Sequence, residues 1–110
     1  MTTQIVASLR IPGLHHWPNA PASHRYLAAE HRHLFHIRAW CPVSHLDRDV
    51  EFIALGEAIA AWLRVQYGDP MQLYTASCEM LARRLIDQFS LSACEVLEDG
   101  ENGALLQRDA

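Results

Sequence analysis

Two consecutive segments with helical periodicity lie in the middle of the chain. The first has an apolar stripe from Ile53 to Tyr67 and stops at Gly68-Asp69-Pro70. The second begins after an N-cap at Thr75 or Ser77 and carries its apolar stripe to about Ser90. A pair of adjacent helices this short needs another layer on which to bury its apolar faces, so the flanking segments decide the fold.

The flanking segments are rich in apolar and β-branched residues and predict strands on both sides of the helices. The predicted strands are Thr3–Ile11, His31–Val43, Ala93–Leu97 and Ala104–Gln107, with a short strand or bulge at Val50–Phe52. The order ββααββ predicts a single α+β domain over residues 1–110. In it, two helices cover one face of a four-stranded antiparallel sheet.

The remaining connection, Leu14–Glu30, contains two prolines and shows no sustained period. It is therefore predicted to be a long loop, with a helical turn near Tyr26–Glu30. Loops of this length are often functional.

Composition excludes several classes of function. The formal net charge is −4, and all nine basic residues are arginines scattered along the chain, which argues against nucleic acid or a membrane surface as the main partner. No stretch approaches the roughly 20 apolar residues of a membrane span, and Met1–Gln4 does not resemble the start of a secretory signal. Three cysteines without CxxC spacing (Cys41, Cys78 and Cys94) are expected to be reduced thiols, so a cytoplasmic protein is expected.

The histidines are the most informative residues for function, because all seven lie in the first 45 positions. His31 and His33 are two apart on a predicted strand and therefore project from the same face. The upstream loop offers His15, with His16 as the alternative, as a third ligand. Three histidines plus water is the open arrangement of a catalytic zinc site, so we expect one divalent metal ion per chain, with zinc preferred.

The alternative is that these side chains are surface or hydrogen-bonded histidines that bind no metal. On a regular strand His36 faces away from His31 and His33, and neither His24 nor His45 has a partner at metal-ligand spacing. Those three are expected to be structural, or to support the metal ligands indirectly.

Several motifs also occur in the order typical of a known family. They are Leu14-His15-His16, His31-Arg32-His33-Leu34-Phe35, Val50-Glu51-Phe52-Ile53-Ala54-Leu55, Ser77-Cys78-Glu79-Met80-Leu81-Ala82 and Val96-Leu97-Glu98-Asp99. On these residues, which span nearly the whole chain, the protein resembles the tunnelling-fold (T-fold) proteins of the 6-pyruvoyl-tetrahydropterin synthase and 6-carboxy-tetrahydropterin synthase group.

The resemblance implies a ring-shaped homo-oligomer whose sheets close into a barrel, with zinc held by the three histidines. It implies that Glu98 anchors the ring of a pterin- or deazapurine-like heterocycle through paired hydrogen bonds. Glu79 and Ser77 are expected to line the same pocket.

The chain also departs from the family. The family's catalytic cysteine is missing from Leu14–Glu30, and no histidine follows the first helix in residues 68–73. His36 or His24 would have to replace the missing base. Two functions therefore stay open: a zinc-dependent lyase or synthase acting on a pterin-like substrate, and a non-catalytic oligomeric binding or interaction protein that keeps only the fold and the metal.

Overall fold

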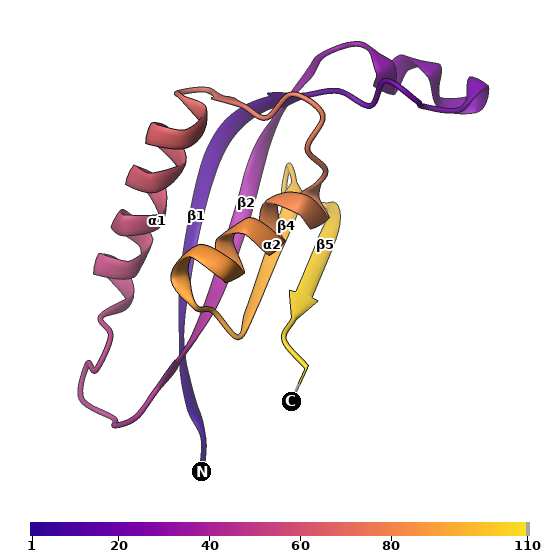
Figure 1. Ribbon diagram of the computed structural model, residues 1–110. Coiled ribbons are helices and arrows are strands. Elements are labelled where there is room, and N and C mark those ends of the chain that lie inside the picture. The colour runs from indigo at the N-terminus through magenta and orange to yellow at the C-terminus, as the bar shows by residue number, and fades with distance from the viewer. Residues whose placement is uncertain (110) are drawn as a thin grey trace.

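A computed structural model describes residues 1–109 and shows an α+β fold, as predicted (Figure 1). Two α-helices and one 3-10 helix accompany a five-stranded sheet of order β3-β1-β2-β4-β5. Along the chain the elements are β1 (Thr3–His15), η1 (Ala22–Ala28), β2 (His31–Val43), α1 (Phe52–Tyr67), β3 (Met71–Gln72), α2 (Cys78–Phe89), β4 (Ala93–Glu98) and β5 (Asn102–Gln107).

The prediction of a four-stranded antiparallel sheet is wrong in one respect. The fifth strand, β3, pairs parallel with β1 at Gly13 and Leu14, which makes the sheet mixed. The other three strand pairs are antiparallel. A two-residue strand has no detectable hydrophobic period, which is why the sequence pattern missed it. Within one chain the sheet is open and has β3 and β5 at its edges.

Strand β1 is four residues longer than predicted and continues through Pro12 and Gly13 to His15. Proline is tolerated there because β3 pairs with β1 only from Gly13 onwards, so Pro12 lies on an open edge. Gly13 is needed because a Cβ atom at this position would lie 2.9 Å from the ring of Phe35. His15 is therefore the last residue of a strand and not part of a loop.

Other elements also differ from the predictions. Strand β4 ends one residue later than predicted, at Glu98, and β5 begins two residues earlier, at Asn102. No strand forms at Val50–Phe52, because Glu51 is the N-cap of α1 and its carboxylate accepts hydrogen bonds from Ile53 N (2.8 Å) and Ala54 N (3.0 Å). In the connection before β2, the helical turn is the 3-10 helix η1, which starts and ends earlier than the predicted turn at Tyr26–Glu30.

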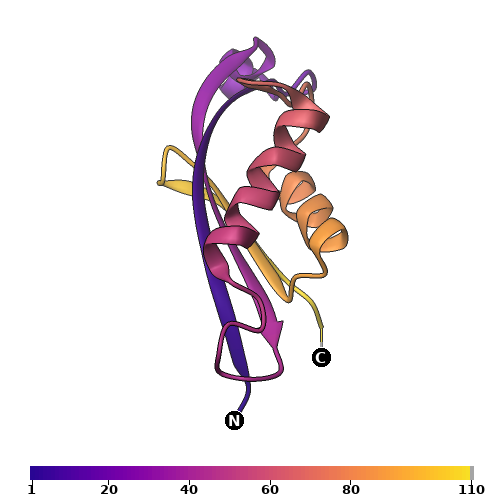
Figure 2. The ribbon, with the colours of Figure 1, turned by 90° about the vertical axis from the view of Figure 1, so that its left-hand side faces the viewer.

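Both α-helices lie on the same face of the sheet, as predicted, and leave the other face uncovered (Figure 2). Helix α1 packs against β1, whereas α2 packs against β4 and β5. The core between these layers consists of apolar side chains that alternate along the strands and face the helices. The largest fully buried ones are Phe35, Ile37, Ile59, Leu63, Met71, Leu81, Leu85, Leu91, Val96 and Cys94. No helix in residues 1–109 combines the length and apolar character needed to span a membrane.

Candidate metal centre

Strand alternation places the candidate metal ligands on the helix-facing side of the sheet. Phe35 points into the core, so His33 and His31, two and four residues earlier on β2, point to the same side. On the neighbouring strands His15 pairs with His31, and Glu98 pairs with Phe35. The inward-facing row that is apolar beneath the helices therefore becomes polar at this end of the sheet.

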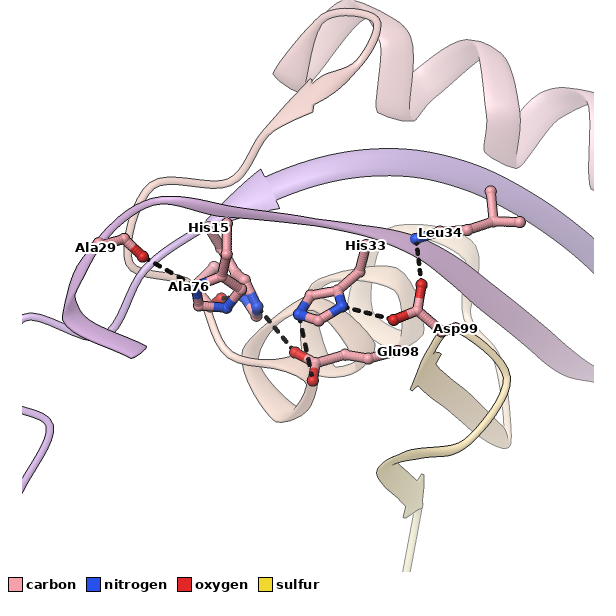
Figure 3. A network of polar contacts seen from close by, with 8 residues as sticks. His15, Ala29, His33, Leu34, Ala76, Glu98 and Asp99 are labelled. Carbon is pink, nitrogen blue, oxygen red and sulfur yellow. Dashed lines mark hydrogen bonds and ion pairs between the residues drawn. The ribbon is translucent and has the colours of Figure 1, made fainter. Parts of the chain in front are cut away.

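The four polar side chains converge on one point. One ligand atom from each of His15, His31, His33 and Glu98 lies within 4.8 Å of the others. His15 Nε2 is 2.8 Å from Glu98 Oε2, and His33 Nε2 is 3.6 Å from Glu98 Oε1 (Figure 3). The cluster can hold a metal ion.

The outer nitrogens of two imidazoles are held by backbone carbonyls. His15 Nδ1 donates to Ala76 O and His31 Nδ1 donates to Ala29 O, both at 2.9 Å. Because a carbonyl oxygen only accepts hydrogen bonds, the proton of each neutral imidazole must be on Nδ1. Each Nε2 then carries a lone pair, which is the form that binds a metal.

The third imidazole is held by a carboxylate. His33 Nδ1 donates to Asp99 Oδ2 at 2.7 Å, and the backbone N–H of Leu34 donates to Asp99 Oδ1 at 2.9 Å. These two hydrogen bonds, the one from Leu34 first, lower the pKa of Asp99 below its ordinary value. From the sequence, Asp99 was included only as the last residue of the motif Val96-Leu97-Glu98-Asp99 and was given no role of its own.

Two of the Nε2 atoms that face the centre of the cluster have no hydrogen-bond partner. His15 Nε2 and His33 Nε2 are buried without a hydrogen-bond partner, and the 2.8 Å contact of His15 brings its lone pair against a carboxylate oxygen of Glu98. Two acceptors this close require either a proton or a metal ion to offset their repulsion. A single proton satisfies one pair of acceptors, whereas a divalent metal ion satisfies all of the converging atoms together. The donor set therefore fits a metal ion.

A cavity of about 570 Å³ opens beside the cluster, between the end of β1, the connection that contains η1 and the N-terminus of α2. This size is within the range of small-molecule sites. Trp17 and Leu27 supply apolar lining, while Glu98, Glu79 and Ser77, the three residues predicted to line a ligand pocket, all reach the cavity. Ser77 also caps α2, because its hydroxyl accepts a hydrogen bond from the N–H of the third helical residue at 3.2 Å.

The other predicted histidines lie outside the cluster. His16 lines the cavity, and its buried Nδ1 has no hydrogen-bond partner, but it is not one of the converging groups. His15 therefore occupies the position for which both were considered. His36 lies on the uncovered face of the sheet against Gly100, and His24 lies on η1, hydrogen-bonded to the hydroxyl of Ser23. Neither candidate base lines the cavity beside the cluster.

The sequence interpretation did not assign Cys78 to the site, yet this thiol lines the cavity. Burial, reinforced by the charges of Glu98 and Glu79, raises its pKa to about 12, so the thiol is protonated at neutral pH. The other two cysteines, Cys41 and Cys94, are also free thiols.

No family model matches the chain, and a search of the curated proteins finds none similar to it.

Proposed function

We propose that this protein binds one divalent metal ion, preferentially zinc, through the Nε2 atoms of His15, His31 and His33. The observation that carries the proposal is the shared orientation of these imidazoles: each Nδ1 donates to a fixed acceptor, and the Nε2 atoms converge. Three neutral imidazoles with an adjacent carboxylate suit zinc and other late first-row metals.

The metal and the adjoining cavity together support the binding of a small heterocyclic ligand. A bound zinc ion would act as a Lewis acid toward a ligand oxygen. Glu98 lines both the metal cluster and the cavity, so its carboxylate is placed to accept hydrogen bonds from the edge of an amino-pyrimidinone ring. These features support a divergent relative of the 6-pyruvoyl- and 6-carboxy-tetrahydropterin synthases that binds a pterin- or deazapurine-like compound.

The observations favour binding over the reaction of that family. Proton abstraction requires a positioned base within reach of the ligand. Neither histidine predicted for that role, His36 or His24, lines the cavity, and the buried Nδ1 of His16, which does line it, has no hydrogen-bond partner to orient the ring. A non-catalytic protein that retains the fold and the metal is therefore the preferred form of the proposal.

The open sheet edges at β3 and β5 also suit a ring-shaped homo-oligomer in which neighbouring chains cover them. Light scattering tests this assembly, and a monomer would contradict it.

Metal content is the primary test. Tag-free wild-type protein, analysed by inductively coupled plasma mass spectrometry, should contain about one zinc ion per chain, whereas His31→Ala/His33→Ala should contain none. The matched control is His24→Ala/His45→Ala, which removes two histidines that lie outside the cluster. The control should keep the wild-type content. Absence of zinc from the wild type, together with failure to take up added zinc, would refute the proposal.

Ligand binding is tested separately with neopterin as a fluorescent probe. Zinc-loaded wild type should quench its fluorescence with saturable binding, and Glu98→Gln should weaken binding at least tenfold, because an amide cannot accept two hydrogen bonds side by side. Glu101→Gln, an exposed substitution in the following turn, is the control. Metal binding without any response to neopterin would retain the metal site and reject the pterin-like ligand.

A further inference from the structure

Asp99 does not face the metal position, but it is tied closely to one of the residues that do. Its carboxylate accepts hydrogen bonds from His33 Nδ1 (2.7 Å) and from the backbone N–H of Leu34 (2.9 Å), as Figure 3 shows. Its own backbone N–H donates to Leu34 O at 2.8 Å. Three hydrogen bonds thus fix Asp99 to two consecutive residues of β2.

The backbone conformation of Asp99 is that of a tight hairpin turn. Its φ angle is +56° and that of Gly100 is +72°, and Asp-Gly is a preferred pair where both central residues of a turn have positive φ. The N–H of Glu101 donates to Glu98 O at 2.9 Å and closes this turn between β4 and β5. The turn accounts for the backbone of Asp99, whereas the hydrogen bonds from His33 and Leu34 account for the position of its carboxylate.

His33 also differs from the other two histidines of the cluster. His15 and His31 donate to neutral backbone carbonyls, whereas His33 donates to a carboxylate. A charged acceptor makes the stronger hydrogen bond and increases the electron density on the opposite ring nitrogen. His33 Nε2 is therefore expected to be the strongest donor of the three.

We propose that Asp99 is a positioning residue for the metal, which holds His33 in the Nδ1-protonated tautomer and strengthens Nε2 as a ligand. This inference rests on the proposed function, because it requires that His33 bind a metal ion. It assigns to Asp99 a role distinct from that of the adjacent Glu98, whose carboxylate points into the cluster itself.

The substitution Asp99→Asn separates this role from simple support of the turn. The backbone N–H of Leu34 can only donate, so the single amide oxygen should turn toward it and the NH₂ group should face His33 Nδ1. An imidazole can move its proton to the other nitrogen, whereas a backbone amide cannot. The variant should therefore favour the tautomer of His33 with its proton on Nε2, and metal binding must then overcome that preference.

The test combines two measurements. Zinc affinity is measured on metal-free wild type, Asp99→Asn and the control Glu101→Gln by competition with a chromophoric chelator. The tautomer of His33 is read in the metal-free proteins from the ¹⁵N shifts of its ring at pH 8. We expect a 10- to 100-fold weaker affinity for Asp99→Asn, a change of tautomer in that variant, and no change in the control.

The outcomes distinguish the inference from the function on which it rests. A wild type that binds no zinc refutes both. A wild type that binds zinc, with equal affinity and an unchanged tautomer in Asp99→Asn, refutes only the role of Asp99. If Asp99→Asn fails to fold, the wild-type tautomer still decides the matter, because His33 protonated at Nε2 in the metal-free wild type would overturn the inference.

Discussion

The two ends of strand β2 both bring histidines and carboxylates together, but they do so in different ways. At the end of β2 that leads toward α1, His45 Nε2 lies 3.5 Å from Asp49 Oδ1. The other oxygen of Asp49 accepts hydrogen bonds from the backbone N–H and the hydroxyl of Ser44, both at 2.8 Å. At the opposite end, His31 and His33 begin the strand and point into the metal cluster.

The difference lies in the balance of donors and acceptors. Around Asp49 each acceptor has a donor from the same loop, and the His45 side chain is 57% exposed to solvent. In the metal cluster the Nδ1 protons are already donated outward, and buried Nε2 lone pairs face the carboxylate of Glu98. Buried acceptors that face one another are stabilised by a cation, and this surplus of acceptors, more than the residue types, supports the proposed metal site.

The largest effect that would test this comparison is thermal stabilisation by zinc. At a free zinc concentration 100 times the dissociation constant, binding to the folded state adds about 2.7 kcal/mol, which should raise the Tm of a domain this small by on the order of 10 °C. His15→Ala should abolish the increase, because it removes a ligand from the cluster. His45→Ala should retain the increase, because His45 pairs with Asp49 in the loop after β2 and is not part of the cluster. Equal shifts in both variants, measured by differential scanning calorimetry, would show that zinc binds elsewhere.

Strand periodicity is the reason that two of the four residues of the cluster could be placed side by side from the sequence. Residues two apart share a face whatever the rest of the fold does, so His31 and His33 were placed together correctly. His15 required β1 to extend through Pro12 and Gly13, a pair that normally ends a strand. The open edge and the packing of Phe35 against Gly13 override that rule, and both are tertiary features.

The remaining parts of the site depend on pairings between distant segments. Glu98 was proposed only through the resemblance to a family, because its role depends on the pairing of β4 with β2. Asp99 was missed because its contact with His33 spans 66 residues of sequence and no local pattern encodes it. The uncovered side of the sheet likewise separates His36 from the cluster, as alternation along β2 predicted.

A smaller effect tests whether close packing supports the cluster. In Gly13→Ala the new methyl group would lie 2.9 and 3.0 Å from two ring atoms of Phe35, whose ring makes T-shaped contacts with the rings of His15 and His33. Phe35 is 1% exposed, so its ring cannot move aside into solvent. We expect a loss of about 1–3 kcal/mol in the free energy of unfolding, measured with urea, and weaker zinc binding.

Gly56→Ala is the matched control for that substitution. Gly56 lies within α1, and the nearest atom to an added Cβ is 3.9 Å away, so the methyl group fits. Alanine is the better helix former by about 1 kcal/mol, so this variant should be more stable than wild type and bind zinc normally. Destabilisation of both variants would show that the packing around Phe35 has no special role.

The smallest effect concerns Asp49, in the loop between β2 and α1, and depends on pH. Hydrogen bonds from the backbone N–H and then the hydroxyl of Ser44 lower the pKa of Asp49 below its ordinary value of 3.8. Because the folded state holds this carboxylate ionised to lower pH than the unfolded state does, the resulting stability is fully present above the unfolded pKa. It is lost as the pH falls through the folded pKa.

With metal chelated, the stability advantage of wild type over Asp49→Asn should therefore be constant near neutral pH and shrink below about pH 4. Ser44→Ala, which removes one of the two donors, should show part of the same change in urea titrations performed across this range. An advantage that persists unchanged at the lowest pH would mean that Asp49 stabilises the loop through its shape and not through its charge.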